Sequence, residues 1–169
     1  VNAAAWSHWR PLVEKDSAEL NREFLVNVAA PLLLAADVFR AFWQAAGQEE
    51  NHRRNRSIIN ISSIAGLRVF PGIGQAAYAG EKSMLNMITL HQAAELAPFG
   101  IRVNAIAPNT FPTRVPTERV ADAITGLIEG DRSGEIIVLD ERDIEGVVTS
   151  ESLGQAITRG RSSPTAPTP

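Results

Sequence analysis

Apolar residues occur along this chain in two kinds of segment. Short, continuous apolar runs lie at 57–61, 101–107 and 135–139, and residues 1–5 read as the end of another run. Longer segments at 17–46, 75–96 and 117–128 have the length and spacing of amphipathic helices. Strands that alternate with helices predict crossover units and a parallel sheet. Because these strands are apolar on both faces, we predict an α/β fold with helices on both sides of the sheet.

Polar and conformationally special residues mark the predicted helix ends. Asp16 or Ser17 would cap the first helix, and Thr117 would cap the third. Gly47 would end the first helix. Pro31 lies inside that helix and lacks an N–H group, so it must kink the helix or remove one of its hydrogen bonds.

Two further segments read as irregular. Residues 48–56 form a predicted charged loop, whose Arg53, Arg54 and Arg56 either hold a phosphate or face water, and the second interpretation is favoured. The hydrophobic pattern fades after residue 140, and the end of the chain is rich in serine and proline. We therefore predict one domain over residues 1–140 and a polar, partly disordered tail over 141–169.

Composition narrows the classes of function. The chain has 169 residues, 44% hydrophobic and 21% charged, which is typical of a globular domain. A net charge of −3 gives no reason to expect nucleic acid or an anionic membrane as a partner. The lack of cysteine excludes disulfides and thiolate metal sites and fits a cytoplasmic protein, and no metal site is expected. No uninterrupted apolar run reaches the length of a membrane span, so no membrane partner is expected.

One pair of residues indicates proton-transfer chemistry. Tyr78, the only tyrosine, precedes Lys82 by four residues. On a helix this spacing puts both side chains on one face, one turn apart. A nearby ammonium favours the phenolate, so we expect the pKa of Tyr78 to fall below its usual value of about 10.

Together with Asn27 in the first helix and Ser63 after the strand at 57–61, this pair resembles the catalytic tetrad of the short-chain dehydrogenase/reductase family. Residues 58–66 (Ile-Ile-Asn-Ile-Ser-Ser-Ile-Ala-Gly) are similar to the serine-bearing strand and loop of that family. Residues 94–108 (Ala-Glu-Leu-Ala-Pro-Phe-Gly-Ile-Arg-Val-Asn-Ala-Ile-Ala-Pro) are similar to its next helix end and strand. Residues 1–4 resemble its Asn-Asn-Ala-Gly signature, and the resemblance covers residues 1–140.

The resemblance implies a Rossmann-like, doubly wound parallel sheet and hydride transfer between NAD or NADP and a small-molecule carbonyl or alcohol. Tyr78 would be the general acid or base, and Lys82 would hold down the pKa of that tyrosine and bind the cofactor ribose. Ser63 would stabilise charge on the substrate oxygen, and Asn27 would anchor a water in a proton relay. The implied cofactor-binding residues are Asn2, Ala3, Ala4, Tyr78, Lys82, Pro108 and Thr110.

The sequence also departs from the pattern of this family. No glycine-rich dinucleotide fingerprint precedes Val1, so we expect an incomplete sheet that lacks the first three strands. The chain is then expected to be part of a longer polypeptide or to work with another chain. Glu81 stands where the family prefers a small residue, next to Lys82 in sequence, although neighbours on a helix point about 100° apart and need not pair.

Two alternatives stay open. A non-catalytic member of the family could act as a structural partner subunit in a hetero-oligomer. A weaker resemblance to the pteridine reductase branch is opposed by Ser63, where that branch commonly has aspartate. The helices at 17–46 and 75–96 resemble the pair with which the family builds a four-helix interface, which implies a homodimer or homotetramer.

Overall fold

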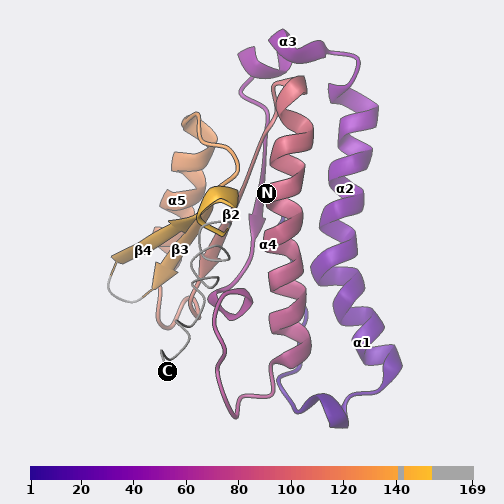
Figure 1. Cartoon of the computed structure of the whole chain (residues 1–169), viewed down its shortest axis with the longest axis vertical. Coiled ribbons are helices and arrows are strands. Elements are labelled where there is room, and N and C mark those ends of the chain that lie inside the picture. Colours follow the sequence, from indigo (N-terminus) through magenta and orange to yellow (C-terminus); the bar gives the residue numbers. More distant parts are fainter. Residues whose placement is uncertain (141–142, 154–169) are drawn as a thin grey trace, which may run out of the picture.

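The computed structural model describes residues 1–140 and 143–153. It contains a mostly parallel sheet flanked by helices, as Figure 1 shows, which confirms the α/β class. The longer helices are α1 (Ser17–Phe24), α2 (Ala30–Val38), α3 (Gly47–Arg53), α4 (Ala76–Leu96) and α5 (Thr117–Glu129). The strands are β1 (Ser57–Ile61), β2 (Arg102–Pro108), β3 (Ile136–Asp140) and β4 (Asp143–Val148).

The sheet has the order β1-β2-β3-β4, in which β1, β2 and β3 are parallel and β4 is antiparallel to β3. Asn2 adds a parallel bridge on the other side of β1. Its N–H donates to the Ile59 carbonyl at 2.8 Å, and its own carbonyl accepts from the Ile61 N–H at 2.9 Å. The first residues therefore run beside β1 as the end of a strand, although the pairing is a single bridge.

Alternate residues of β1 face two different cores. Ile59 and Ile61 pack with Leu127 of α5 on one face of the sheet. Ile58 packs on the other face with Ala35 of α2 and Ala93 of α4. Helix α5 thus covers one face, while α4 and the long helix beside it cover the other (Figure 1). Burial on both faces explains why these strands are continuous apolar runs in the sequence.

The first long helix is continuous from Ser17 to Trp43 but changes its winding twice. Two wider π-helical segments, Leu25–Ala29 and Phe39–Trp43, follow α1 and α2. In the first, the Ala30 N–H donates to the Leu25 carbonyl, five residues back. In a regular α-helix the ring of Pro31 would clash with the Asn27 carbonyl, and the wider winding relieves this contact. The disturbance predicted at Pro31 is therefore a π turn, and the helix ends at Trp43 rather than at 46.

The predicted charged loop at 48–56 is wrong, because Gly47–Arg53 form α3. The arginines of this segment already have protein partners: Arg53 and Arg54 pair with Glu50, and Arg56 donates to Asn51. These contacts favour the structural interpretation of the arginine cluster over a phosphate site.

Two other local predictions also need correction. Thr117 is the first residue of α5, and Pro116 takes the cap position that had been expected for Thr117. After residue 140 the chain forms β4, which pairs with β3, so the predicted tail begins with a strand. Residues 141–142 and 154–169 of that predicted tail lie outside the described residues.

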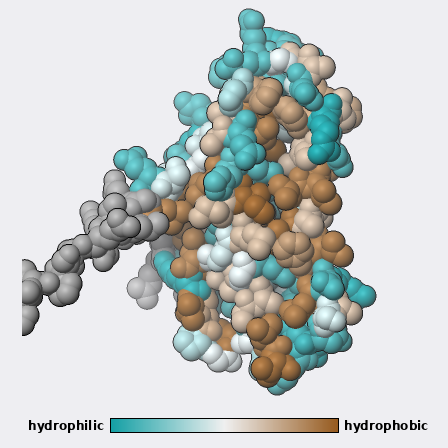
Figure 2. All heavy atoms as spheres, turned by 45° about the vertical axis from the view of Figure 1, so that its right-hand side comes forward, coloured by the Kyte–Doolittle hydropathy of each residue, from teal (hydrophilic) through white to brown (hydrophobic). Residues whose placement is uncertain are grey.

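The outward face of the long helix is apolar. Figure 2 shows apolar side chains gathered over the middle of this face, with hydrophilic residues toward its ends. By length and composition alone, Ser17–Trp43 could cross a membrane, and 22% of its most apolar window is buried in the fold; a single helix of this kind is weak evidence for a span. Glu23 and Asn27 lie fully buried on its inner side. The exposed apolar side chains are Phe24, Leu25, Leu32, Leu33, Leu34 and Phe42.

Candidate active site

The carboxyl ends of the parallel strands carry the predicted catalytic residues. Ser63 follows β1, Pro108 ends β2, and Tyr78 lies in the first turn of α4. Chain segments that leave parallel strands at one edge of a sheet meet there, and ligands of such sheets bind at this edge. A pocket of about 460 Å³ lies at this position, and Ser63, Tyr78, Pro108 and Thr110 all line it.

Tyr78 and Ser63 both line this pocket. Burial raises the pKa of Tyr78 above 10.0, interaction with the Ser63 side chain lowers it in part, and the nearby Glu81 carboxylate raises it again. The expected fall in the pKa of Tyr78 is therefore wrong for this arrangement. Removing the phenol from water disfavours the phenolate more than the surrounding groups favour it.

Lys82 lies one turn after Tyr78 and is almost completely buried, with 2% of its surface exposed. Its Nζ atom is 5.7 Å from the centre of the Tyr78 ring and donates to the Ile61 carbonyl at 2.8 Å. Burial lowers the pKa of Lys82 from 10.5 to about 8, and the negative charge of Glu81 opposes this shift. The predicted pairing of Tyr78 and Lys82 on one face of α4 is present.

Asn27 does not line the pocket but is fixed behind it. Its Oδ1 accepts from the Trp6 N–H at 2.9 Å, and its Nδ2 donates to the Trp6 carbonyl at 2.7 Å. The same Nδ2 donates to Glu81 Oε2 at 2.7 Å. Asn27 therefore joins the long helix to α4 and to the segment that follows Asn2.

The predicted cofactor-binding residues divide into two groups. Pro108 and Thr110 line the pocket together with Tyr78. Asn2 instead donates from its side chain to Asn60 Oδ1 at 2.8 Å, and the exposed Ala3 and Ala4 lie outside the residues that line this pocket. The structure places this second group beside the end of β1, at the same edge of the sheet.

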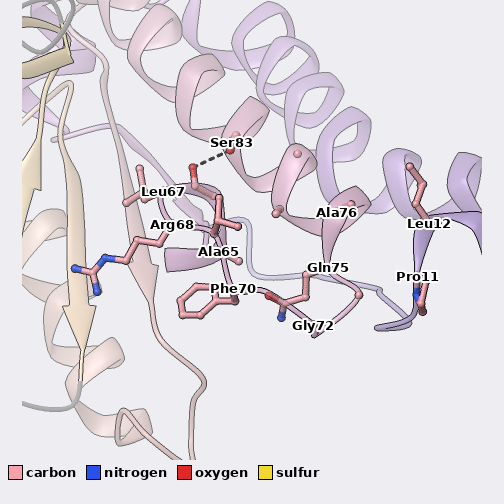
Figure 3. A pocket seen from close by; sticks show the side chains of 15 residues that line it. Pro11, Leu12, Ala65, Leu67, Arg68, Phe70, Gly72, Gln75, Ala76 and Ser83 are labelled. Atoms are coloured by element: carbon pink, nitrogen blue, oxygen red, sulfur yellow. Dashed lines mark hydrogen bonds between the residues drawn. The ribbon is translucent and has the colours of Figure 1, made fainter. Parts of the chain in front are cut away.

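The loop between β1 and α4 is held by its contact with the helix. A Cβ atom on Gly66 would lie 2.7 Å from the Lys82 carbonyl carbon, so only glycine fits at this approach. The Gly66 carbonyl accepts a 2.8 Å hydrogen bond from the Ser83 hydroxyl, drawn in Figure 3. This contact holds the loop that carries Ser63 against the first turns of α4. Figure 3 also shows a second pocket, of about 570 Å³, beyond the loop.

Several residues of the site were missed by the sequence analysis. Trp9, Phe70, Ile73 and Phe111 provide apolar walls, and the centre of the Trp9 ring lies 6.5 Å from that of Tyr78. These residues come from three segments that are far apart in the sequence, so no local spacing predicts that they line one pocket. Glu81 was noticed as unusual, but its bond to Asn27 depends on how two helices pack.

The parallel sheet with helices on both faces is a Rossmann-type fold, and its site lies where such folds bind ligands. The family model described as short chain dehydrogenase matches residues 1–123. The chain therefore belongs to the short-chain dehydrogenase family, and the resemblance seen in its motifs is confirmed.

Individual relatives support the same assignment. The chain is 45% identical to protein FixR of Bradyrhizobium diazoefficiens over 92 residues, which are 54% of this chain and 30% of FixR. It is 32% identical to a cyclopentanol dehydrogenase of Comamonas sp. over 123 residues, 73% of this chain and 45% of that enzyme. The chain thus spans less than half the length of these relatives.

Solved structures show the same fold. An oxidoreductase of the short chain dehydrogenase/reductase family from Brucella ovis, in complex with a partially ordered NAD, aligns with a TM-score of 0.67 and 33% identity. The alignment covers 82% of this chain and 63% of that one. Other similar structures contain NADH or NADP.

Proposed function

We propose that the protein containing this chain transfers a hydride between NAD or NADP and a small-molecule carbonyl or alcohol. The proposal is carried by the arrangement of Tyr78 and Ser63 in one pocket of about 460 Å³, with Nζ of the buried Lys82 5.7 Å from the centre of the Tyr78 ring. Membership of the short-chain dehydrogenase family and the nicotinamide cofactors of similar structures support it. The proposed site residues are Asn27, Ser63, Tyr78 and Lys82.

Each of these side chains has a physical reason for its role. In the direction of reduction, the Tyr78 phenol would give its proton to the substrate oxygen, and its raised pKa keeps that proton available at neutral pH. The Ser63 hydroxyl would donate a hydrogen bond to the same oxygen as negative charge develops on it. The Lys82 ammonium would stabilise the phenolate that remains after the transfer.

Asn27 would hold the water that returns a proton to the site. Its side chain is already engaged, because Nδ2 donates to Trp6 and Glu81 while Oδ1 accepts from the Trp6 N–H, so its main-chain carbonyl is the better acceptor for a water. In an α-helix that carbonyl would bind the N–H four residues later, but this position is Pro31, which has none.

The described residues fit the nicotinamide and ribose end of the cofactor, which supplies the hydride when bound. Pro108 and Thr110 line the pocket beside Tyr78, and Ala3 and Ala4 present small, exposed side chains at the same edge of the sheet. Short side chains at a strand end allow a ligand to approach the backbone closely. Lys82 would donate to the ribose hydroxyls with the N–H groups that Ile61 does not use.

The decisive experiment is Tyr78→Phe in the intact protein. This variant keeps the ring and its contact with Trp9 but removes the proton donor, so turnover of NADH or NADPH with a panel of ketones should fall at least about 100-fold. Cofactor binding, followed as quenching of tryptophan fluorescence, should stay within about twofold. Near-normal turnover of the variant would refute the role of Tyr78. If the wild-type protein neither binds the cofactors nor turns over, the structural partner subunit becomes the better hypothesis.

We also propose that the protein is a cytoplasmic homodimer or homotetramer that associates through the long helix and α4. The support for this interface is the exposed apolar face of the long helix, with side chains such as Leu33 and Leu34, and the exposed Met84 and Met87 on α4. An apolar area of this kind on a soluble domain usually marks a protein interface. Its burial by a second copy would explain the apolar composition of Ser17–Trp43 without a membrane.

A further inference from the structure

Glu81 is a buried carboxylate that the assigned roles do not use. It lies next to Lys82 on α4 with 7% of its surface exposed, on the side of the helix that meets Asn27. Burying a carboxylate is unfavourable unless hydrogen bonds or opposite charges compensate for the lost water. The contacts of Glu81 therefore indicate what this side chain is held there to do.

The first contact fixes the orientation of the Asn27 amide. Glu81 Oε2 accepts from Asn27 Nδ2 at 2.7 Å, and the Asn27 amide also holds both the N–H and the carbonyl of Trp6. An ionised carboxylate can only accept hydrogen bonds. If the amide turned over, its oxygen would face the carboxylate oxygen and its bonds to Trp6 would be reversed. Glu81 thereby locks the amide in one orientation.

The second effect of Glu81 is electrostatic, on the neighbouring Lys82. Four charged or titratable groups act on Glu81 or respond to it: Lys82 and Tyr78 on α4, Glu23 on α1, and Lys15 just before α1. Lys15 already forms an ion pair with Glu23, so its positive charge is largely compensated. Burial is the larger effect and raises the pKa of Glu81 above its usual value, while the hydrogen bond from Asn27 opposes this shift. Within the described part of the chain, Glu81 is the acidic group that favours the charged form of Lys82.

We propose that Glu81 is a positioning residue of this active site, which locks the Asn27 amide against Trp6 and keeps the buried Lys82 ammonium charged. The catalytic consequence rests on the proposed function, whereas the two structural effects do not. A small residue at this position could provide neither the hydrogen bond nor the charge.

The charge effect can be measured directly on Lys82. This chain contains only two lysines, Lys15 and Lys82, so ¹⁵N-lysine labelling gives two side-chain resonances from it, and Lys82→Met assigns them. Glu81→Gln keeps a hydrogen-bond acceptor for Asn27 but removes the charge. The pKa of Lys82 should then fall by roughly one further unit, the size of an interaction between neighbouring charges. Glu95→Gln, an exposed change on the same helix, should not move it.

The catalytic readout is the pH profile of the intact protein. A lower pKa of Lys82 means that the ammonium is lost at lower pH, so the alkaline limb of ketone reduction should move to lower pH in Glu81→Gln by about the same amount. Glu81→Ser, which places a small residue there, should give the same two shifts if Glu81→Gln does not fold. In Glu81→Ser the Asn27 side-chain amide should also exchange with solvent at least about tenfold faster.

The outcomes separate the two proposals. An unchanged Lys82 titration in both variants would overturn the positioning role, whatever the activity. A shifted titration with an unshifted pH profile would overturn its catalytic part. If the Lys82 titration shifts in the variants but the wild-type protein itself shows no turnover, the positioning role is supported and the proposed function is refuted.

Discussion

The buried ammonium of Lys82 should make the stability of the protein depend on pH in a defined direction. Its pKa falls from 10.5 to about 8 in the folded state, a difference of about 2.5 units. At about 1.4 kcal/mol per unit, the charged form lowers the free energy of unfolding by roughly 3 kcal/mol at neutral pH. This cost disappears when both the folded and the unfolded chain hold a neutral lysine.

The sign follows from proton binding. Between about pH 8 and 10.5 the folded protein has lost the Lys82 proton while the unfolded chain still holds it. Stability rises with pH wherever the unfolded state binds more protons, so this window is one of increasing stability. From pH 7 to 9.5 the contribution amounts to roughly 2 kcal/mol. Tyr78 acts in the opposite sense, because its pKa is raised, but only above its unfolded value of 10.0.

The test compares the wild-type protein with Lys82→Met by urea unfolding at pH 7 and pH 9.5. The wild-type protein should gain about 2 kcal/mol relative to the variant over this interval. At a single pH the comparison is less direct, because methionine also leaves the Ile61 carbonyl without its hydrogen bond, at a cost of about 1–3 kcal/mol. If both proteins changed by the same amount with pH, the argument from burial of the ammonium would be refuted.

Two further predictions address the packing and the surface. Gly66→Ala should destabilise the protein by about 1–3 kcal/mol in chemical denaturation, because its Cβ would lie 2.7 Å from the Lys82 carbonyl carbon. Gly80→Ala on α4, where the new Cβ would meet open space, is the control and should be neutral or stabilising in the same series. Leu33→Glu places a charge on the outward apolar face and should shift the oligomer toward monomer in light scattering, whereas an oligomer of unchanged size would rule out this face as the interface.

Local sequence patterns located most of the elements that build the site. Strand β1 was predicted at 57–61 and is observed at Ser57–Ile61, and α4 begins within a residue of its predicted start. These segments are apolar runs or long periodic helices bounded by polar or glycine residues, so their identity depends on neighbours in sequence. Strand β4 was missed because its sequence, Asp-Ile-Glu-Gly-Val-Val, is not a continuous apolar run, although it pairs with β3, which lies just before it in the chain.

The sequence by itself determined that Tyr78 and Lys82 share a helix face, and that Ser63 leaves a parallel strand at the edge of the sheet where ligands bind. Both follow from fixed backbone geometry and from the order of the elements. The tertiary structure decided the rest: the contact of Glu81 with Asn27, the position of Trp9 beside Tyr78, and the direction in which the pKa of Tyr78 moves. Contacts between helices and the loss of water around a side chain depend on everything packed against it, which no spacing along the chain encodes.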